Sequence, residues 1–372
     1  MADFEESKQI EKLLDVDCPS CGSKLFYSAE HRQISCHHCG YKEDYQRDNG
    51  QVVELDLNAA LQQLTYFVPE KTDKKVYDCK SCGAKFMVDV DKTRVNCGFC
   101  GSENVNLEAF DHKYIQPSGI LPFEVPKKKA EDLFKDWVGK GWFHPGKLKT
   151  LARLDGLHGV YIPFWTFDAD TSSDWKGEAG FNYYESVRVK VGDSYQQQQV
   201  KKVRWEWRSG HLNHFFDDVI VSASSNLEQR FLDRILPFKM EQTVNFDARL
   251  MVGWESEIYG VELDQGWKKG NEIMDEQLRF MCMQALGGDT QRNLSVKTEK
   301  CNKTYKHVIL PVWLCSYRFN EKIYRFVING QTGKVHGQKP IAWWKVILVI
   351  LIFVLFIASI VWMRESGIFA GD

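Results

Sequence analysis

The second half of the chain is dominated by segments in which apolar and polar residues alternate with a period of two, the pattern of half-buried β-strands. These segments lie between about residues 159 and 340 and read GVYIPFWTFDA, ESVRVKV, VRWEW, DDVIVSAS, ESEIYGVEL, HVILPVWLCSYRF and KIYRFVI. A helical period replaces the alternation at about 270–286, and hairpin-type turns stand at Asn320-Glu321 and at 329–333. The pattern predicts an α+β fold with a mostly antiparallel, β-rich domain and a few helices.

A different pattern stands near the C-terminus, where VILVILIFVLFIASIVWM (346–363) contains no charged residue. A helix of this length spans about 27 Å at ~1.5 Å per residue, close to the ~30 Å hydrocarbon core of a bilayer. Trp343, Trp344 and Trp362 flank it, as expected at a membrane interface. Three lysines precede the helix within a few residues and a single arginine follows it. This asymmetry predicts a single-pass protein of the cell (inner) membrane with its N-terminal bulk in the cytoplasm.

The N-terminal part carries two sets of four cysteines with the spacing C-x2-C-x14-C-x2-C. The first set is Cys18, Cys21, Cys36 and Cys39, and the second is Cys79, Cys82, Cys97 and Cys100. Zinc binds four thiolates in a tetrahedron, and two Cys-x-x-Cys knuckles joined by a β-ribbon supply them. A glycine follows each knuckle, so the chain can turn tightly and direct its amides at the sulfurs. We therefore predict two small zinc ribbons with one structural Zn²⁺ ion each.

The two cysteine sets form an internal repeat, because the segments around Cys18 and Cys79 align without a gap at an offset of 61 residues. Redox-active dithiols are the alternative, but such a pair normally opens a helix of a thioredoxin-like unit, and the pattern indicates none. A four-thiolate site has no open position for water, so catalytic zinc is not indicated. Zinc-binding thiolates require a reducing compartment, in agreement with a cytoplasmic location. His37 and His38, inside one knuckle, are predicted to be surface residues.

The patterns divide the chain, whose 372 residues suffice for two or three domains. The segments are an N-terminal helix (1–15), zinc ribbon 1 (16–56), a helical connector (57–75), zinc ribbon 2 (76–110), a linker with an amphipathic helix (111–158), the β-rich domain (159–340), one transmembrane helix (341–363) and a short tail (364–372). The net charge of −2 gives no general attraction to nucleic acid or to anionic lipid.

Other motifs carry weaker chemical signals. Gly141–Lys147 fits G-x4-G-K, but Leu148 stands where a phosphate loop requires Ser or Thr, so an ATPase is not indicated. VKKVRWEWRSGH (200–211) interleaves basic and aromatic residues as a nucleic-acid surface does, although a core strand is the favoured interpretation. The candidate active-site residues of an enzyme are Asp217, Asp218, Asp289, Arg292 and His307. Turn capping, ion pairing and buried hydrogen bonds are the favoured roles for these side chains, and we assign no catalytic residue.

The order of motifs after residue 70 resembles a bacterial family of zinc-ribbon membrane proteins. The motifs that carry the resemblance are KLKTLARLDGLHGVYIPFWTFDADTSSDWKGEAG, HLNHFFDDVIVSAS, GGDTQR, KHVILPVWLCSYRF and FVINGQTGKVHGQKP, followed by the terminal apolar helix. Members are often labelled as like the primosomal protein N′ (replication factor Y) helicase, or as TFIIB-type zinc ribbon proteins. One branch is linked to phage-shock protein A, which it helps to recruit to the membrane. The resemblance implies an adaptor in the response to membrane stress.

The leading hypothesis is therefore an adaptor or scaffold that is anchored in the lipid bilayer and presents its zinc ribbons to a protein partner at the cytosolic face. Nucleic-acid binding, without helicase activity, is the second hypothesis, because zinc ribbons often serve replication and transcription. An enzyme in the β-rich domain is the third. The sequence does not identify the partner or the oligomeric state.

Overall fold

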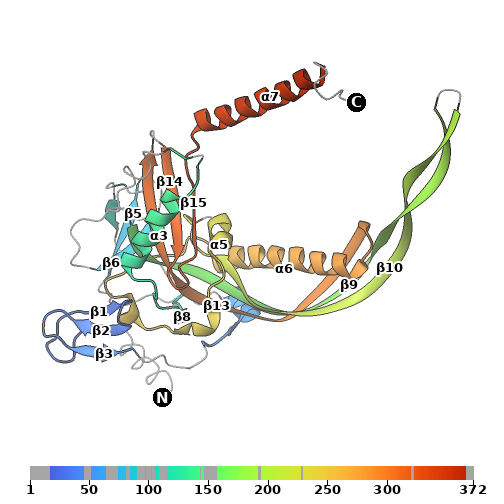
Figure 1. The fold of residues 1–372 in the computed structure, drawn as a ribbon. Helices are drawn as coiled ribbons and strands as arrows, with labels where there is room; N and C mark the ends of the chain where they lie inside the picture. The colour runs from blue at the N-terminus through green and yellow to red at the C-terminus, as the bar shows by residue number, and fades with distance from the viewer. Residues whose placement is uncertain are drawn as a thin grey trace.

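The computed structural model describes residues 17–45, 52–63, 74–80, 84–89, 97, 102, 105–108, 115–142, 144–145, 157–191, 194–227, 229–319 and 322–365. Its class is α+β with mostly antiparallel strands, as the alternation pattern predicts (Figure 1). The helix expected at 1–15 and residues 366–372 of the tail lie outside the described residues.

Three long strands organise the molecule: β9 (Leu157–Val191), β10 (Ser194–Ser222) and β13 (Thr290–Phe319). β9 lies in the middle and pairs antiparallel with both neighbours. The prediction of shorter, separate strands is wrong here, because β9 and β10 each join two of the predicted segments. The polar residues 170–178 of β9 form no turn, because β10 pairs with all of them and β13 with nearly all of them. Hydrogen bonding on both edges therefore outweighs their low β-propensity.

Shorter strands extend this sheet. β14 (Lys322–Asn329) and β15 (Val335–Gly337) follow β13 as a meander, which confirms the predicted turn at 329–333. The remaining short strands of the body are β4 (Leu55–Asp56), β8 (Gly119–Ile120), β11 (Val244–Asn245) and β12 (Glu255–Glu257). The predicted strand ESEIYGVEL contributes only β12, because the amides of Gly260 and Val261 both donate to Ala223 O and turn the chain away.

One long helix, α6 (Leu263–Leu286), covers a face of the three long strands and begins earlier than the predicted residue 270 (Figure 1). Gly266 and Gly270 let its backbone approach the sheet, since a Cβ at these positions would lie 2.5 Å from Trp165 and 2.7 Å from Phe167. Every fourth residue from Gly266 to Leu286 is buried. This stripe winds slowly around the helix, so α6 can follow a twisted sheet.

Shorter helices surround the body. They are α2 (Leu57–Gln63), α3 (Lys127–Gly139), α5 (Gln229–Ile235) and the 3₁₀ turns η2 (Met240–Gln242) and η3 (Ala248–Met251). The predicted amphipathic pattern of α3 is confirmed, because Ala130, Phe134 and Val138 form its buried side.

The two cysteine-rich repeats have different surroundings. The strands of ribbon 1, β1 (Leu25–Ser28), β2 (Gln33–Cys36) and β3 (Lys42–Asp44), form a three-stranded sheet of their own. Those of ribbon 2, β5 (Lys74–Cys79), β6 (Lys85–Asp89) and β7 (Val105–Glu108), belong to the main sheet, because β6 pairs with β12 and β12 with β9. Ribbon 2 is thus continuous with the body through backbone hydrogen bonds.

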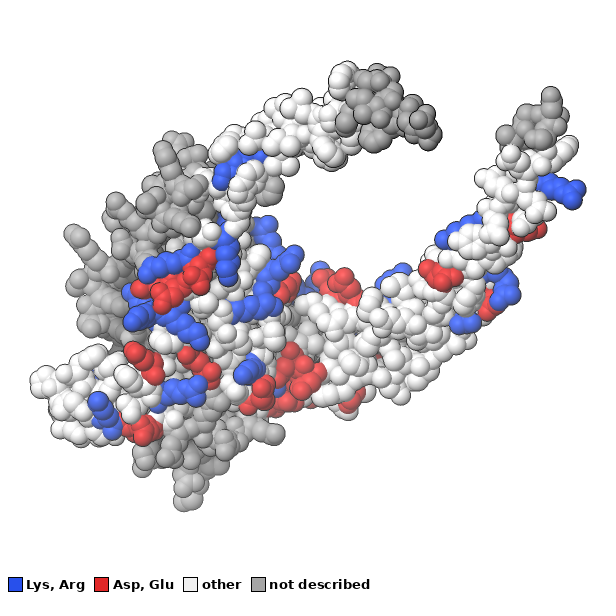
Figure 2. All heavy atoms as spheres, viewed as in Figure 1, with Lys and Arg blue, Asp and Glu red and all other residues white. Residues whose placement is uncertain are grey.

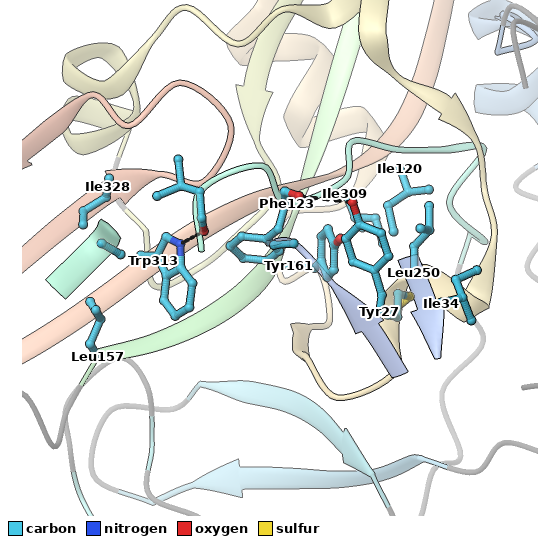
Figure 3. Close-up of a cluster of buried hydrophobic side chains, with 14 of the residues drawn as sticks. Tyr27, Ile34, Ile120, Phe123, Leu157, Tyr161, Leu250, Ile309, Trp313 and Ile328 are labelled. Carbon is cyan, nitrogen blue, oxygen red and sulfur yellow. Dashed lines mark hydrogen bonds between the residues drawn. The ribbon is translucent and has the colours of Figure 1, made fainter. Parts of the chain in front are cut away.

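Ribbon 1 is joined to the body by side chains (Figure 3). Leu25, Tyr27 and Ile34 share one apolar cluster with Phe123 and Tyr161 of the body. The hydroxyl of Tyr27 donates to Phe123 O at 3.3 Å, so the ring is fixed at its polar end as well. Burial of three large side chains stabilises this interface by several kcal/mol, at about 1.5–3 kcal/mol each.

The outer part of the long hairpin projects from the body. β13 accompanies β9 only as far as Gly180, so residues 181–191 of β9 and 194–204 of β10 pair only with each other among the described residues. We call this two-stranded segment the arm. Figures 1 and 2 show that it curves away from the body beyond the end of α6.

Candidate functional site

Four cysteines of ribbon 1 meet at the ends of its strands. Gly22 and Gly40 adopt positive φ angles of 70° and 77°, which L-residues with a Cβ rarely adopt, and each turns the chain after a knuckle. The amides of these glycines donate to Cys18 O at 2.8 Å and Cys36 O at 3.0 Å. The local sequence therefore folds both knuckles through backbone hydrogen bonds that do not involve a metal ion.

The four Sγ atoms of Cys18, Cys21, Cys36 and Cys39 all lie within 4.8 Å of one another. Cys18 Sγ is 3.5 Å from Cys39 Sγ, and Cys21 Sγ is 3.6 Å from Cys36 Sγ. A disulfide requires about 2.05 Å, whereas a tetrahedron with bonds of about 2.3 Å has edges of about 3.8 Å. The sulfurs are thus placed as metal ligands and not as disulfides, and the cluster can hold a metal ion.

The protonation of the thiols depends on their neighbours. Hydrogen bonds from the side chain and backbone of Ser23 lower the pKa of Cys21 to about 6. The backbone of Tyr41 lowers the pKa of Cys39, but hydrogen bonds with the other thiols and burial together raise it to about 12. Within the cluster, Cys21 is therefore the thiol that favours the metal-binding thiolate form. The ring of His37 stacks on Phe26 at 3.6 Å, and both His37 and His38 are exposed, as predicted.

The second cysteine set repeats this backbone geometry. Cys18 N donates to Ser23 O and Cys79 N to Ala84 O, at positions 61 residues apart. Cys36 N donates to Tyr41 O and Cys97 N to Ser102 O, again at the same offset. Cys79 and Cys97 are fully buried, at 0% exposure, whereas Cys82 and Cys100 lie outside the described residues. The repeat in sequence is therefore a repeat in hydrogen bonding at both described knuckle positions.

The remaining candidate residues do not form one site. Asp289 accepts a hydrogen bond from Asn182 N at 2.7 Å, and Arg292 pairs with Glu178 and lies 3.9 Å over the Trp205 ring. His307 is buried beside Trp165, with Nδ1 2.7 Å from Ile115 O. Burial lowers the pKa of His307 to about 4, so the ring is neutral at pH 7. These residues act as structural hydrogen-bond and ion-pair partners, which was the favoured interpretation.

Asp217 and Asp218 lie at a bulge where β10 shifts its register against β9. Asp218, in a left-handed conformation with φ 51°, donates its amide to Asp168 Oδ1 at 2.5 Å. Lys306 Nζ lies 2.8 Å from Asp218 Oδ1, 3.7 Å from Asp168 Oδ2 and 3.2 Å from Glu54 Oε1. Burial raises the pKa of Asp168 to about 6. The lysine provides the counter-charge of this cluster, a role that no sequence motif indicated.

The strand segment VKKVRWEWRSGH is more exposed than predicted. Trp207 retains 66% of its surface, so the interpretation as a core strand is wrong at this position. The register does place Trp205 and Trp207 on one face and Arg204 and Arg208 on the other, as alternation requires. Residues 200–204 of the segment form the inner end of the arm, and residues 205–211 lie next to it, near the point where α6 ends and β13 begins.

The C-terminal helix α7 (Trp343–Glu365) contains a span, Trp343–Trp362, with a mean hydropathy of 2.9 and no burial against the rest of the protein. It is long and apolar enough to cross a membrane, and its free apolar surface differs from that of a core helix. Its first turn is tied to the end of α3. Lys345 Nζ donates to Trp142 O at 2.8 Å and His144 O at 3.0 Å, and Lys339 Nζ to Lys140 O at 2.7 Å.

Comparison with curated proteins finds this chain similar to an uncharacterised protein, YdjG, of Bacillus subtilis (strain 168). The two are 27% identical over 343 residues, which cover 90% of this chain and 92% of that protein. No protein-family model matches the chain, and no solved structure matches it. The similarity extends over most of both chains, so it is not confined to the cysteine sets.

Proposed function

We propose that this protein is a membrane-anchored scaffold whose two zinc ribbons stabilise a body that binds a protein partner beside the membrane. The observation that carries the proposal is the closed cluster of four Sγ atoms joined to the core of the body. Zinc fits this cluster, because it prefers four thiolates in a tetrahedron and such a site leaves no position for a substrate. The metal then stabilises the fold and takes no part in catalysis.

Zinc in ribbon 2 is part of the same proposal. Its ligands would be Cys79, Cys82, Cys97 and Cys100, supported by the knuckle hydrogen bonds repeated at Cys79 and Cys97. Two ions per chain are expected.

The place of action is the membrane surface. The exposed apolar face of α7 supports a single span, and the lysines before it support a cytoplasmic body at the inner membrane of a bacterial cell. The resemblance to zinc-ribbon membrane proteins supports a role in the membrane-stress response, with a membrane-remodelling protein of the phage-shock protein A type as the class of partner. The dispersed positions of Asp218, Asp289 and His307 give no support to the enzyme hypothesis.

A co-purification experiment tests the scaffold proposal. Full-length protein is isolated from native membranes in mild detergent, and zinc is measured on the same sample. We expect two zinc ions per chain and a protein partner whose recovery falls when the exposed ribbon residue His38 is replaced by Glu, while the zinc content stays at two. The control is Glu276→Gln at an exposed position of α6, a helix that shares no apolar cluster with the described residues of either ribbon, and we expect it to leave recovery unchanged.

Recovery of the same proteins with both variants would contradict recognition through ribbon 1. Recovery of nucleic acid in their place, with retention that falls steeply with salt, would favour the second hypothesis.

A further inference from the structure

One face of the arm, from its inner end at Tyr184 and Lys201 to Tyr195 near its tip, has a distinct chemistry. Cross-strand pairs share a face in an antiparallel ribbon, and here Tyr184 is opposite Lys201 and Arg188 opposite Gln197. Alternation places Tyr195 on the same face, because it stands two and six residues before Gln197 and Lys201. Tyr184 and Tyr195 are 65% and 70% exposed. We call these four side chains, Tyr184, Arg188, Tyr195 and Lys201, the tip face.

Among the residues that the structure describes, the tip face carries positive charge and no carboxylate. Between Asn182 and Lys201, the other described positions on this face are asparagine, serine, two glutamines and Lys190, which is opposite Tyr195. The carboxylate of this part of the arm, Glu185, lies on the opposite face and is paired there with Lys202. The two faces therefore differ, one being basic and aromatic and the other neutralised by an ion pair.

The position of the arm relates this face to the membrane. In Figure 1, α7 begins in the upper part of the molecule and points toward the side on which the arm rises to its tip, while ribbon 1 lies toward the lower end. A bilayer that receives α7 therefore adjoins the end of the molecule to which the arm extends. The arm rises clear of the body in Figure 2, so nothing of the drawn surface separates its tip from that end.

We propose that the tip face is a second membrane contact, which binds anionic lipid headgroups of the bilayer that holds α7. Arginine and lysine bind lipid phosphates, and exposed tyrosines are typical of the headgroup region because they combine an apolar ring with a polar hydroxyl. A projecting two-stranded ribbon has little stability of its own, so a surface contact would also fix its orientation. The inference rests on the proposed membrane anchoring.

Photocrosslinking of the full-length, zinc-loaded protein in lipid nanodiscs tests the contact. The photoreactive residue p-benzoylphenylalanine replaces Tyr195 at the tip face, Trp207 next to the inner end of the arm or Trp344 at the start of α7. Trp207 is the matched control, being on the same face of β10 and 66% exposed. In discs with 30% phosphatidylglycerol we expect at least five times more lipid adduct at position 195 than at 207. We expect this excess to disappear in pure phosphatidylcholine or in the Arg188→Glu/Lys201→Glu variant.

Equal adduct at positions 195 and 207, with strong adduct at 344, would overturn the tip contact and leave the anchor intact. Absence of adduct at 344 would overturn the anchoring and the tip contact together. A crosslink from position 195 to a second copy of the chain, or its loss on addition of single-stranded DNA, would assign the tip face to a different partner and overturn the lipid assignment.

Discussion

Ribbon 1 and ribbon 2 have the same cysteine spacing and the same described hydrogen bonds at the first cysteine of each knuckle, but they are joined to the body in different ways. Ribbon 1 keeps its own three-stranded sheet and contributes side chains such as Tyr27 to a shared apolar cluster. Ribbon 2 extends the main sheet through β6 and β12, and Cys79 and Cys97 themselves lie in the core cluster of β9 and β13. A repeated motif thus determines its metal site locally, whereas its tertiary surroundings are determined by residues outside the motif.

Loss of metal should give the largest difference in stability between variants of the two ribbons. We expect Cys18→Ser/Cys36→Ser and Cys79→Ser/Cys97→Ser each to reduce zinc from two ions to one, because the sites are built from separate residues. Structural zinc contributes up to about 10 kcal/mol to the folding of a small ribbon, so the affected ribbon unfolds. The ribbon 2 variant should have the lower melting temperature, since its strands are hydrogen-bonded into the main sheet.

Zinc is measured by plasma mass spectrometry and unfolding by circular dichroism in detergent. Cys301→Ser, at an exposed cysteine outside both ribbons, is the control and should change neither value. Equal melting temperatures of the two ribbon variants would contradict the conclusion that ribbon 2 is attached to the body more strongly than ribbon 1.

Core truncation at equivalent positions gives the next largest effect. Leu25 and Phe86 are 61 residues apart and correspond in the repeat, and both are buried, at 3% and 1% exposure. We expect Leu25→Ala to lower the free energy of unfolding by about 3 kcal/mol and Phe86→Ala by about 4 kcal/mol, through lost contacts and a residual cavity. Urea denaturation in detergent measures both. Val53→Ala, at a 66% exposed side chain, should change stability by less than about 0.5 kcal/mol.

A pH effect on stability is expected from His307, which lies between the contacts of the two ribbons with the body. His307 lines a small cavity together with Met87 of ribbon 2 and Met251 of η3, the turn on which β1 of ribbon 1 packs. Its folded-state pKa of about 4 lies below the ordinary histidine value of 6.5, so the unfolded chain binds the proton more readily between these values. Stability from this residue is therefore complete above pH 6.5 and falls as the pH decreases toward 4.

His307→Asn keeps a donor near Ile115 O but removes the titrating ring. We expect the loss of stability between pH 7 and pH 4.5 to be about 2 kcal/mol smaller in this variant than in the wild-type protein. The difference between the two proteins is measured at each pH, so acid release of zinc affects both alike. Parallel stability curves over that range would refute the assignment.

The smallest effect concerns the knuckles. Gly22→Ala and Gly40→Ala should each lower the free energy of unfolding by about 1 kcal/mol, because an L-residue resists positive φ. A Cβ meets nothing within 4 Å at either position, so the cost is purely conformational. Asn, which tolerates this conformation better, should recover part of the loss at Gly22 in thermal unfolding. A loss of zinc in the alanine variants would instead indicate that the turn is required for binding.

The sequence predicts the local features well, because they depend on neighbouring residues. The spacing around Cys18 and Cys36, the amphipathic face of α3 and the apolar α7 all follow from short-range patterns. The long strands could not be predicted, because residues 170–178 have the polar composition of a turn. Only pairing with the distant β10 and β13 makes them a strand.

The candidate residues illustrate the same limit. Asp168, Asp218 and Lys306 form one cluster although each comes from a different strand, and alternation alone gives no distance between them. The sequence assigns Lys339 and Lys345 only to the flank of the apolar helix, but both also bind backbone carbonyls just after the end of α3. The projection of the arm could not be predicted for a related reason. VRWEW has the alternation of a half-buried strand whether or not a second layer covers it.

The pairing of β9 with β13 determines the order in which the chain folds. It joins Leu157 to Cys315, which are 158 positions apart, whereas the cysteine cluster of ribbon 1 brings together Cys18 and Cys39. Closing a long loop costs more entropy than closing a short one, and non-local pairing slows folding. On the ribosome, ribbon 1 can thus take up its metal while the partner strand of β9 is still unsynthesised. Zinc starvation should therefore affect newly made chains far more than chains that have already completed the long sheet.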